Sequence, residues 1–413
     1  MSMLLEKCKG LKKAAEILSI ADSKDKNQAL REVIASIKSH KEYILEENKK
    51  DVEVAKASGM KESLIDRLRL TEDRIGGIID SIENIIDARD PIWKSNDVWT
   101  LENGLVISKM TVPIGVIGII YESRPNVTVD AFALTLKSGN CVLLRGSSNS
   151  LNSNRALVMA IKKGLDNSPI SSDVIGFIDD GNREIVKEML TCNEYIDLII
   201  PRGGKSLINM VVKNATVPTI ETGEGNCHIY VDSSADIKKA VAIIENAKVQ
   251  RPGVCNACET LLVHKDIARE LLPKVVKAIG DKVEIRGSQE VREIVDVKEA
   301  TDKDWAEEYL DYILAVKLVK STQEAIMHIN KYGTKHSEAI LTESLVNANT
   351  FQRQVDAATV YVNASTRFTD GGEFGFGGEM GISTQKIHAR GPMGLNELVT
   401  LKYTILGNGH IRG

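Results

Sequence analysis

The sequence predicts an α/β protein with two parallel sheets, each covered by helices on both faces. From Ile114 onward, short apolar runs alternate with amphipathic helical segments such as residues 128–137, 235–248 and 321–331. The runs are apolar at consecutive positions, which is typical of strands buried on both faces of a parallel sheet. They are too many for one small domain, and 413 residues at roughly 150 per domain predict more than one. The runs are IGVIGII, CVLL, VIGFI, IDLII, HIYV, TLLV, ILAVKLV, EAIL and TVYV.

Residues 1–90 are predicted to be helical and to pack on the first domain. Apolar residues recur at steps of three and four over residues 4–18 and 30–37, which places them on one face of each helix. Thr71 is a predicted N-cap for a further helix, whose isoleucine stripe covers residues 75–86. The polar faces carry both charge signs, which favours packing on a larger domain over binding to a membrane surface.

The dipeptide Asn103-Gly104 predicts a hairpin, because it suits the positive φ angles of a type I′ turn between two strands. The C-terminal tail also has strand character. We expect residues 1–225 to form one domain, with the hairpin at about 98–112. Residues 226–385 would form the second domain, and residues 386–413 would return and end in a strand.

The charge balance gives no reason to expect a polyanionic partner. Lys and Arg total 53, Asp and Glu total 57, and neither half of the chain is conspicuously basic. Bulk electrostatics would therefore not recruit nucleic acid or an anionic membrane. The longest apolar stretch, residues 112–121, contains Pro113, Gly115 and Gly118, and a membrane-spanning helix needs about 20 apolar residues.

The N-terminus and the cysteines indicate a cytoplasmic protein. Charges begin at Glu6 and no apolar core follows, so no secretory signal is expected. The six cysteines lie mostly inside apolar runs, which fits a reducing compartment better than a disulfide framework.

Three short motifs do not identify a site. Gly203-Gly204-Lys205-Ser206 resembles the end of a phosphate-binding loop, but Ile199 stands where that loop needs its first glycine. A glycine pair before a helix could still hold an anion with exposed N–H groups. No Gly-x-Gly-x-x-Gly is present. Cys255 and Cys258 have the spacing of a redox or zinc pair, but nothing completes a metal site, so no metal is expected.

Cys255 stands out by its surroundings. Residues 247–256 are polar, contain Pro252 and Gly253, and lead directly into an apolar run. A cysteine in such a loop is better placed for nucleophilic attack than one within a strand. Most cysteines, however, are small buried residues, and on these residues alone both alternatives stay open.

Four segments carry a resemblance to a known family. They are residues 121–148, 250–264 (QRPGVCNACETLLVH), 319–340 (VKSTQEAIMHINKYGTKHSEAI) and 374–398. Together they resemble the aldehyde dehydrogenase superfamily over essentially the whole chain, and within it the γ-glutamyl phosphate reductase family. The resemblance implies an aldehyde dehydrogenase-like fold, with two parallel-sheet α/β domains and an oligomerisation arm formed by the hairpin and the tail.

The resemblance implies a reaction at a thiol. Cys255 is the implied nucleophile, and Asn126 stands where a side-chain amide would stabilise an oxyanion together with the backbone N–H of Cys255. Asn126 also suits a helix N-cap, and the two roles are compatible. Cys258 matches no catalytic position and is expected to pack in the core. His328 and His336 belong to residues 319–340, which we call the signature segment, and are expected to be structural.

The implied cofactor is NADPH. Arg145 stands where relatives carry a lysine against the adenosine ribose, and Ser147 and Ser148 follow in place of an acidic residue. A cation with hydroxyls and no carboxylate favours NADP(H) over NAD. By the same resemblance, Gly203 and Gly204 would bring a helix N-terminus to the nicotinamide half of the cofactor.

Further acids and cations complete the implied site. Glu308 resembles the glutamate that holds the nicotinamide ribose, with a solvated acid at a helix end as the alternative. Arg124, Arg251 and Arg367 are candidates to bind the phosphate and α-carboxylate of the substrate. Glu221 stands where hydrolytic relatives carry a water-activating base, but its neighbours differ, and a phosphate-releasing enzyme needs no such base.

The implied reaction reduces L-γ-glutamyl phosphate to L-glutamate 5-semialdehyde and phosphate, the second step of proline biosynthesis from glutamate. The alternatives are an NAD-dependent hydrolytic dehydrogenase and a non-catalytic scaffold of the same fold. The arm suggests a homodimer or tetramer, with a sheet extension inside one chain as the alternative. The lability of the acyl phosphate suggests association with the glutamate 5-kinase that makes it.

Overall fold

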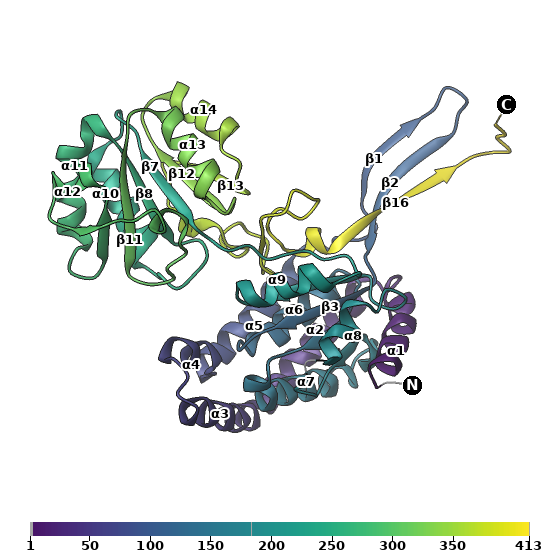
Figure 1. Cartoon of the computed structure of the whole chain (residues 1–413). Helices are drawn as coiled ribbons and strands as arrows, with labels where there is room; N and C mark the ends of the chain where they lie inside the picture. Colours follow the sequence, from purple (N-terminus) through teal and green to yellow (C-terminus); the bar gives the residue numbers. More distant parts are fainter. Residues whose placement is uncertain (1–2, 183, 413) are drawn as a thin grey trace. The chain divides into compact units, whose positions relative to one another are not determined.

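The computed structural model describes residues 3–182 and 184–412, which form two compact units (Figure 1). The first unit takes the described residues up to Thr222, then Gly375–Gly381 and the residues from Met393 onward, and the second takes Gly223–Phe374 and Ile382–Pro392. The first division lies close to residue 225, but the later ones differ from the expected single return at residue 386. The reason is local packing, because Gly378 lies against Ile85 and so joins this glycine-rich segment to the first unit.

The first unit is built on a four-stranded parallel sheet. Its strands are β3 (Val116–Tyr121), β4 (Cys141–Arg145), β5 (Ile175–Phe177) and β6 (Leu198–Arg202), in the order β5-β4-β3-β6. The central strand β3 is buried at every position, as its apolar run predicts. The chain passes from β3 through β4 to β5 and then crosses to β6 on the other side of β3. The carboxyl ends of β3 and β6 are therefore the switch point at which open α/β sheets bind ligands.

The N-terminal helices form where the apolar spacing predicts them. The hydroxyl oxygen of Thr71 accepts a hydrogen bond from the N–H of Arg74 at 3.2 Å and caps a helix whose isoleucine stripe is buried. None of the described helices is long and apolar enough to cross a membrane. The helices before the sheet are α1 (Met3–Leu18), α2 (Ser23–Ser39), α3 (Lys41–Ala57), α4 (Glu62–Leu68) and α5 (Glu72–Asp87). Those that follow its strands are α6 (Asn126–Lys137), α7 (Leu151–Leu165), α8 (Glu184–Leu190) and α9 (Lys205–Asn214).

The second unit is built on a seven-stranded parallel sheet in the order β10-β9-β11-β8-β7-β12-β13. Its strands are β7 (Cys227–Val231), β8 (Cys258–His264), β9 (Glu284–Gly287), β10 (Lys298–Glu299), β11 (Ile313–Val319), β12 (Ser337–Leu341) and β13 (Thr359–Val362). Every apolar run that was expected to be a strand is a strand in one of the two sheets. The sequence does not predict β9 and β10, because they are short and carry charged residues. The helices are α10 (Ile237–Val249), α11 (Lys265–Ile279), α12 (Gln289–Arg292), α13 (Thr322–Tyr332) and α14 (Leu345–Gln354), and β14 (Ile382–Ser383) pairs with β15 (Gly391–Pro392).

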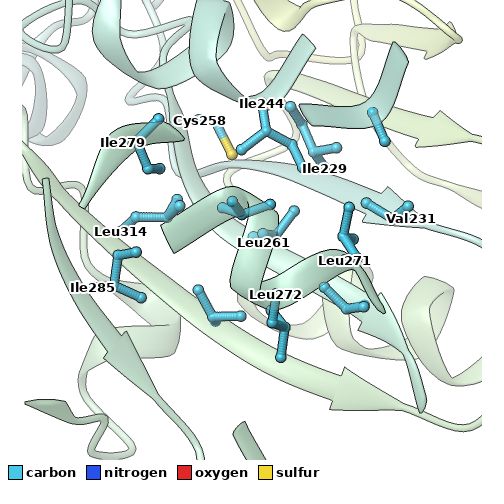
Figure 2. Packing of buried hydrophobic residues seen from close by; sticks show 14 of the residues in the cluster. Ile229, Val231, Ile244, Cys258, Leu261, Leu271, Leu272, Ile279, Ile285 and Leu314 are labelled. Atoms are coloured by element: carbon cyan, nitrogen blue, oxygen red, sulfur yellow. The ribbon is translucent and has the colours of Figure 1, made fainter. Parts of the chain in front are cut away.

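A hydrophobic cluster joins the sheet of the second unit to the helices α10 and α11 (Figure 2). Leu261 of β8, Ile244 of α10 and Leu271 of α11 are fully buried in it. Cys258 belongs to the same cluster and has no exposed surface, which confirms its predicted place in the core. The cluster anchors the amino end of β8, directly after the loop that carries Cys255.

The hairpin and the C-terminal tail form a three-stranded antiparallel sheet, which we call the arm (Figure 1). Its strands are β1 (Ser95–Thr100), β2 (Val106–Pro113) and β16 (Val399–Leu406), in the order β1-β2-β16. The type I′ turn is wrong, because only Gly104 of the Asn103-Gly104 pair has a positive φ (92°). The N–H of Gly104 donates to the carbonyl of Leu101 at 2.9 Å, which gives a longer turn that ends in a left-handed glycine.

Candidate functional site

Cys255 lies in a tight turn between α10 and the start of β8. The N–H of Ala257 donates to the carbonyl oxygen of Val254 at 3.1 Å, which closes a β-turn with Cys255 as its second residue. Cys255 is half-buried, and its sulfur is a reduced thiol. Cys255 is therefore partly exposed, whereas Cys258 is enclosed.

The residue after Cys255 is held by the segment that follows β13. The Nδ2 group of Asn256 donates to the carbonyl of Thr369 at 2.8 Å, and the hydroxyl of Thr366 donates to the carbonyl of Asn256 at 2.7 Å. The guanidinium of Arg367 donates to Oδ1 of Asn256. Asn256 is 4% exposed, so its side chain fixes the loop and does not face solvent.

Arg367 also lines a cavity of about 180 Å³ beside this turn. Its Nε donates to Oε1 of Gln250 at 2.9 Å. Burial lowers the pKa of the Arg367 guanidinium, and the positive charge of Arg251 lowers it further, so the two predicted arginines lie within electrostatic reach of each other. The cavity is lined by Asn246, Gln250, Arg367, Phe368, Asp370 and Glu373, which gives it a polar lining of mixed charge.

The signature segment forms a buried polar cluster between the neighbouring strands β7 and β12. Oε2 of Glu338 accepts a hydrogen bond from the N–H of His228 at 2.7 Å and lies 3.0 Å from its Nδ1, and both side chains are fully buried. Burial lowers the pKa of His328 to about 3 and that of His336 to about 4. Both rings are therefore neutral near pH 7 and poorly suited to accept a proton there.

In the first unit, Asn126 is the first residue of α6 and not its N-cap, so the predicted capping role is wrong. Pro125 holds the cap position, and no side chain caps this helix end. The Nδ2 group of Asn126 instead donates to Oδ2 of Asp130 at 3.0 Å, one helical turn later. Burial raises the pKa of Asp130 to about 6, while the bond from Asn126 and the charge of Arg202 lower it. Asp130 is not among the predicted site residues, although its four-residue spacing from Asn126 is a usable signal.

Arg145 ends β4, at the carboxyl edge of the first sheet. Its Nη2 donates to the carbonyl of Gly181 at 3.2 Å, which ties it to the segment after β5. The hydroxyl oxygen of Ser147 accepts a hydrogen bond from the N–H of Asn149 at 3.2 Å, and Ser148 begins the short turn that leads to α7. This segment presents one guanidinium and two hydroxyls and contains no carboxylate, a donor set that suits a phosphate.

The glycine pair after β6 leads into α9, but its N–H groups do not simply face solvent. The N–H of Gly204 donates to Oε2 of Glu122 at 2.9 Å. Glu122 directly follows β3, so this bond crosses the switch point of the sheet. A Cβ at Gly203 would lie 2.6 Å from Cδ of Glu122, so the glycine allows this close approach. This corrects the expected anion site, because a carboxylate of the chain itself binds the start of α9.

Comparison with known proteins identifies the family. The family model described as the aldehyde dehydrogenase family matches residues 12–291 and 292–404. This chain belongs to the aldehyde dehydrogenase family. A γ-glutamyl phosphate reductase from Alkaliphilus metalliredigens is 71% identical over 412 residues, which cover 100% of both chains. One from Thermotoga maritima is 54% identical over 414 residues, again 100% of both chains.

Solved structures confirm the predicted aldehyde dehydrogenase-like fold. The crystal structure of a γ-glutamyl phosphate reductase from Thermotoga maritima has a TM-score of 0.97 at 54% identity and covers 100% of both chains. The enzyme of that name from Saccharomyces cerevisiae has a TM-score of 0.57 at 30% identity, over 100% of this chain and 99% of the other. An acetylating aldehyde dehydrogenase from Geobacillus thermoglucosidasius, at 15% identity and a TM-score of 0.72 over 99% and 97% of the chains, shares the fold.

In this aldehyde dehydrogenase, the second unit brings several predicted residues together. Oε1 of Glu308 accepts a hydrogen bond from the N–H of Gly225 at 2.7 Å, and Gly225 packs against the backbone of Cys255. Arg251 and Arg367 belong to the same unit, whereas Asn126 and the other predicted residues belong to the first unit. Among the described residues, no three His, Cys, Asp or Glu side chains gather as metal ligands do.

Proposed function

We propose that this protein reduces L-γ-glutamyl phosphate to L-glutamate 5-semialdehyde with NADPH and releases phosphate, the second step of proline biosynthesis from glutamate. The observation that carries the proposal is the 71% identity, over both full lengths, to a γ-glutamyl phosphate reductase. The half-buried thiol of Cys255 in a turn of the second unit supports it.

Cys255 is the proposed nucleophile. Its thiolate attacks the acyl carbon, a C–S bond forms, and the bond from the acyl carbon to the phosphate oxygen breaks. Phosphate leaves as a stable anion, so the leaving oxygen needs no strong acid. The resulting thioester accepts a hydride more readily than a carboxylate does, and NADPH, when bound, supplies that hydride. The sulfur of Cys255 is then released as a thiolate.

Asn126 and the backbone N–H of Cys255 are the proposed donors to the oxyanion. The Nδ2 group of Asn126 carries two N–H bonds, and Asp130 accepts one of them. Asp130 thereby fixes the orientation of the amide and leaves the second N–H for the substrate oxygen. A donor of this kind contributes about 10²–10³ in rate.

Arg145, Ser147 and Ser148 are the proposed contacts of the 2′-phosphate of NADPH. A guanidinium and two hydroxyls can donate hydrogen bonds to this phosphate, and their segment carries no negative charge that would repel it. Glu308 is proposed at the nicotinamide ribose, with its carboxylate oriented by the N–H of Gly225.

The turn of Gly203 and Gly204 is proposed at the nicotinamide half of the cofactor. Arg124, Arg251 and Arg367 are the proposed cations for the phosphate and the α-carboxylate of the substrate. The polar cavity beside Arg367 suits such a charged substrate better than an apolar aldehyde. Glu221 has no role in this proposal, because the thioester passes to hydride and not to water.

The arm is the proposed contact between copies of this chain, in a homodimer or tetramer. The strand register places Trp99, Ile107 and Ile405 in one row, and the rings of Trp99 and Tyr403 meet edge to face at 6.3 Å. Trp99, Tyr403 and Ile405 are each at least 40% exposed, and a second copy would cover them. Association with glutamate 5-kinase and a cytoplasmic location stay predictions.

The reverse reaction tests the proposed function. Glutamate semialdehyde and NADP⁺ would be mixed with the protein, and NADPH absorbance followed with and without inorganic phosphate, for wild type, Cys255→Ser and Cys258→Ser. The proposal expects NADPH formation that depends on phosphate and is lost only in Cys255→Ser. Formation without phosphate would instead support a hydrolytic dehydrogenase, and no activity in any form would support a scaffold.

A further inference from the structure

The carbonyl group of Cys255 lies in a close-fitting site built by another segment. Cys227, the first residue of β7, is fully buried, and its Sγ donates to the carbonyl oxygen of Cys255 at 3.1 Å. Gly225 lies against the same group, and a Cβ there would collide with the carbonyl oxygen. We call this arrangement of Gly225 and Cys227 the carbonyl cradle.

The carbonyl cradle is held rigidly in place. The N–H of Gly225 donates to Oε1 of Glu308 at 2.7 Å. Asn226 is fully buried, and its Nδ2 group donates to the carbonyl of Tyr332 at 3.0 Å. The N–H of the next residue after Cys227 donates to Oε2 of Glu338 at 2.7 Å. Two residues of the signature segment, Tyr332 and Glu338, thus hold the residues that contact the backbone of Cys255.

The carbonyl in question belongs to a peptide that can rotate. The bond from Cys255 to Asn256 is the central peptide of the β-turn closed between Val254 and Ala257. Such peptides rotate between types I and II, which exchanges the directions of the C=O and the N–H. Type II needs a positive φ at the third residue, and Asn tolerates that conformation. Asn256 does not have a positive φ here, so the turn is not of type II.

We propose that Cys227 is a positioning residue that latches the Cys255–Asn256 peptide and thereby holds the nucleophile's turn in its reactive state. The proposal rests on the proposed function, in which Cys255 is the nucleophile. Without the thiol donor the carbonyl loses this hydrogen bond, and the peptide can turn its dipole to the opposite face. The reversed dipole of this peptide changes the electrostatic field at the sulfur of Cys255. The reactivity of that thiol therefore changes.

The chemistry of Cys227 suits a permanent donor. Burial raises the pKa of its thiol well above the ordinary value, and the charge of Glu338 raises it further, so the thiol stays protonated. On the other side of its sulfur, Nδ1 of His336 lies at 3.7 Å. Burial lowers the pKa of His336 to about 4, so its ring is a weak base and does not take the proton that the latch needs.

Cys258 provides a matched control for the test. It is as fully buried as Cys227 and begins the neighbouring strand, but its sulfur packs in the hydrophobic cluster and donates to the carbonyl of Thr260 at 3.4 Å, not to the loop of Cys255. The experiment compares Cys227→Ala, Cys227→Ser and Cys258→Ala with wild type. It measures kcat and KM in the phosphate-dependent reaction, the melting temperature, and the rate at which iodoacetamide labels Cys255, with the labelled residue identified by mass spectrometry.

The latch predicts a specific pattern. In Cys227→Ala, kcat and the labelling rate of Cys255 fall about fivefold to tenfold, the scale of one lost hydrogen bond, and KM changes less than about twofold. Cys227→Ser restores most of kcat and of the labelling rate, because a hydroxyl can donate a hydrogen bond to the carbonyl of Cys255. Cys258→Ala leaves both near wild type. Equal kcat and labelling rates in Cys227→Ala and Cys258→Ala at matched melting temperatures would overturn the latch. A wild-type protein without activity would contradict the proposed function. The labelling rates of Cys255 in Cys227→Ala and Cys258→Ala would still show whether Cys227 controls the reactivity of that thiol.

Discussion

At the scale of single residues, the groups proposed for catalysis are oriented by neighbours that carry no reactive role themselves. Asp130 holds the amide of Asn126, Asn256 holds the turn of Cys255, and Glu122 binds the N–H of Gly204. Each of these interactions joins a polar group to a partner that keeps one geometry. Substitution of the residue that contacts substrate should therefore lower kcat more than substitution of the neighbour that orients it.

Asn126→Ala is expected to lower kcat by about 10²–10³, because one donor to the oxyanion is lost. Asp130→Ala is expected to cost less, since the amide remains but loses its fixed orientation. Steady-state kinetics in the phosphate-dependent direction measures both, with the exposed Asn167→Ala as control. An Asn126→Ala enzyme with wild-type kcat would remove Asn126 from the mechanism.

The buried neutral His336 is expected to make folding sensitive to acid. Its pKa lies near 4 in the folded protein and near 6.5 in a solvated histidine, so between these values the unfolded chain binds a proton that the folded chain does not. The stability that the neutral ring contributes is therefore present above about pH 6.5 and is lost as the pH falls. His336→Asn should show a smaller drop in melting temperature between pH 7.5 and 5.5 than wild type.

The exposed His388→Asn is the matched control in the same unit and should keep the wild-type pH dependence. An identical decrease in melting temperature in wild type and His336→Asn would show that the His336 ring does not contribute to the acid sensitivity of folding.

At the scale of elements, the loop of Cys255 is fixed because both of its flanking elements are fixed. Lys248 near the end of α10 and Glu259 at the start of β8 form an ion pair at 2.5 Å, and neither side chain is exposed. The N–H of Leu310 donates to the other carboxylate oxygen of Glu259 at 3.1 Å. The pair joins the helix before the loop to the strand after it, so it sets the distance that the loop spans.

Breaking this buried ion pair should destabilise the fold strongly. Glu259→Gln leaves the ammonium of Lys248 without its charged partner, and the expected loss is about 3–5 kcal/mol of unfolding free energy. Replacing both residues with Met should recover most of the loss, because no buried charge remains. Denaturant unfolding followed by circular dichroism compares these variants. Glu270→Gln, in an exposed pair with Lys274, should change little.

At the scale of the whole molecule, the arm presents several large apolar side chains that the described part of the chain leaves exposed. Its strands pair within one chain, β2 with β1 and with β16, so the hairpin and the tail do not need a second copy to form a sheet. The exposed apolar residues remain, and among the described residues the outer edges of β1 and β16 have no strand beside them. Such a surface is typical of one that binds a partner, which supports the proposed contact between copies.

Ile405→Asp is expected to dissociate the proposed oligomer, because it places a charge in the apolar row of Trp99 and Ile107. Thr404→Asp adds the same charge on the opposite face of the same strand and serves as the control. Light scattering after size exclusion gives the mass of each variant. A wild-type mass for Ile405→Asp, or a monomeric wild type, would exclude this face as the contact.

Local sequence determined the elements of this protein. Short runs that are mostly apolar became the strands of two parallel sheets, because a strand covered on both faces is composed largely of apolar side chains. Thr71 capped its helix as predicted, and the polar segment around Pro252 and Gly253 formed the turn that exposes Cys255. These features depend on neighbours along the chain, which the sequence displays directly.

Tertiary structure alone decided which distant residues meet. Cys227 reaches the carbonyl of Cys255, and Glu122 reaches Gly204, only because the strand order places their segments side by side. Pro125 holds the cap position that was predicted for Asn126, and residues 375–392 divide between the units. Periodicity reports whether a position is buried, but not which partner buries it, so the contacts that orient the proposed site required the fold.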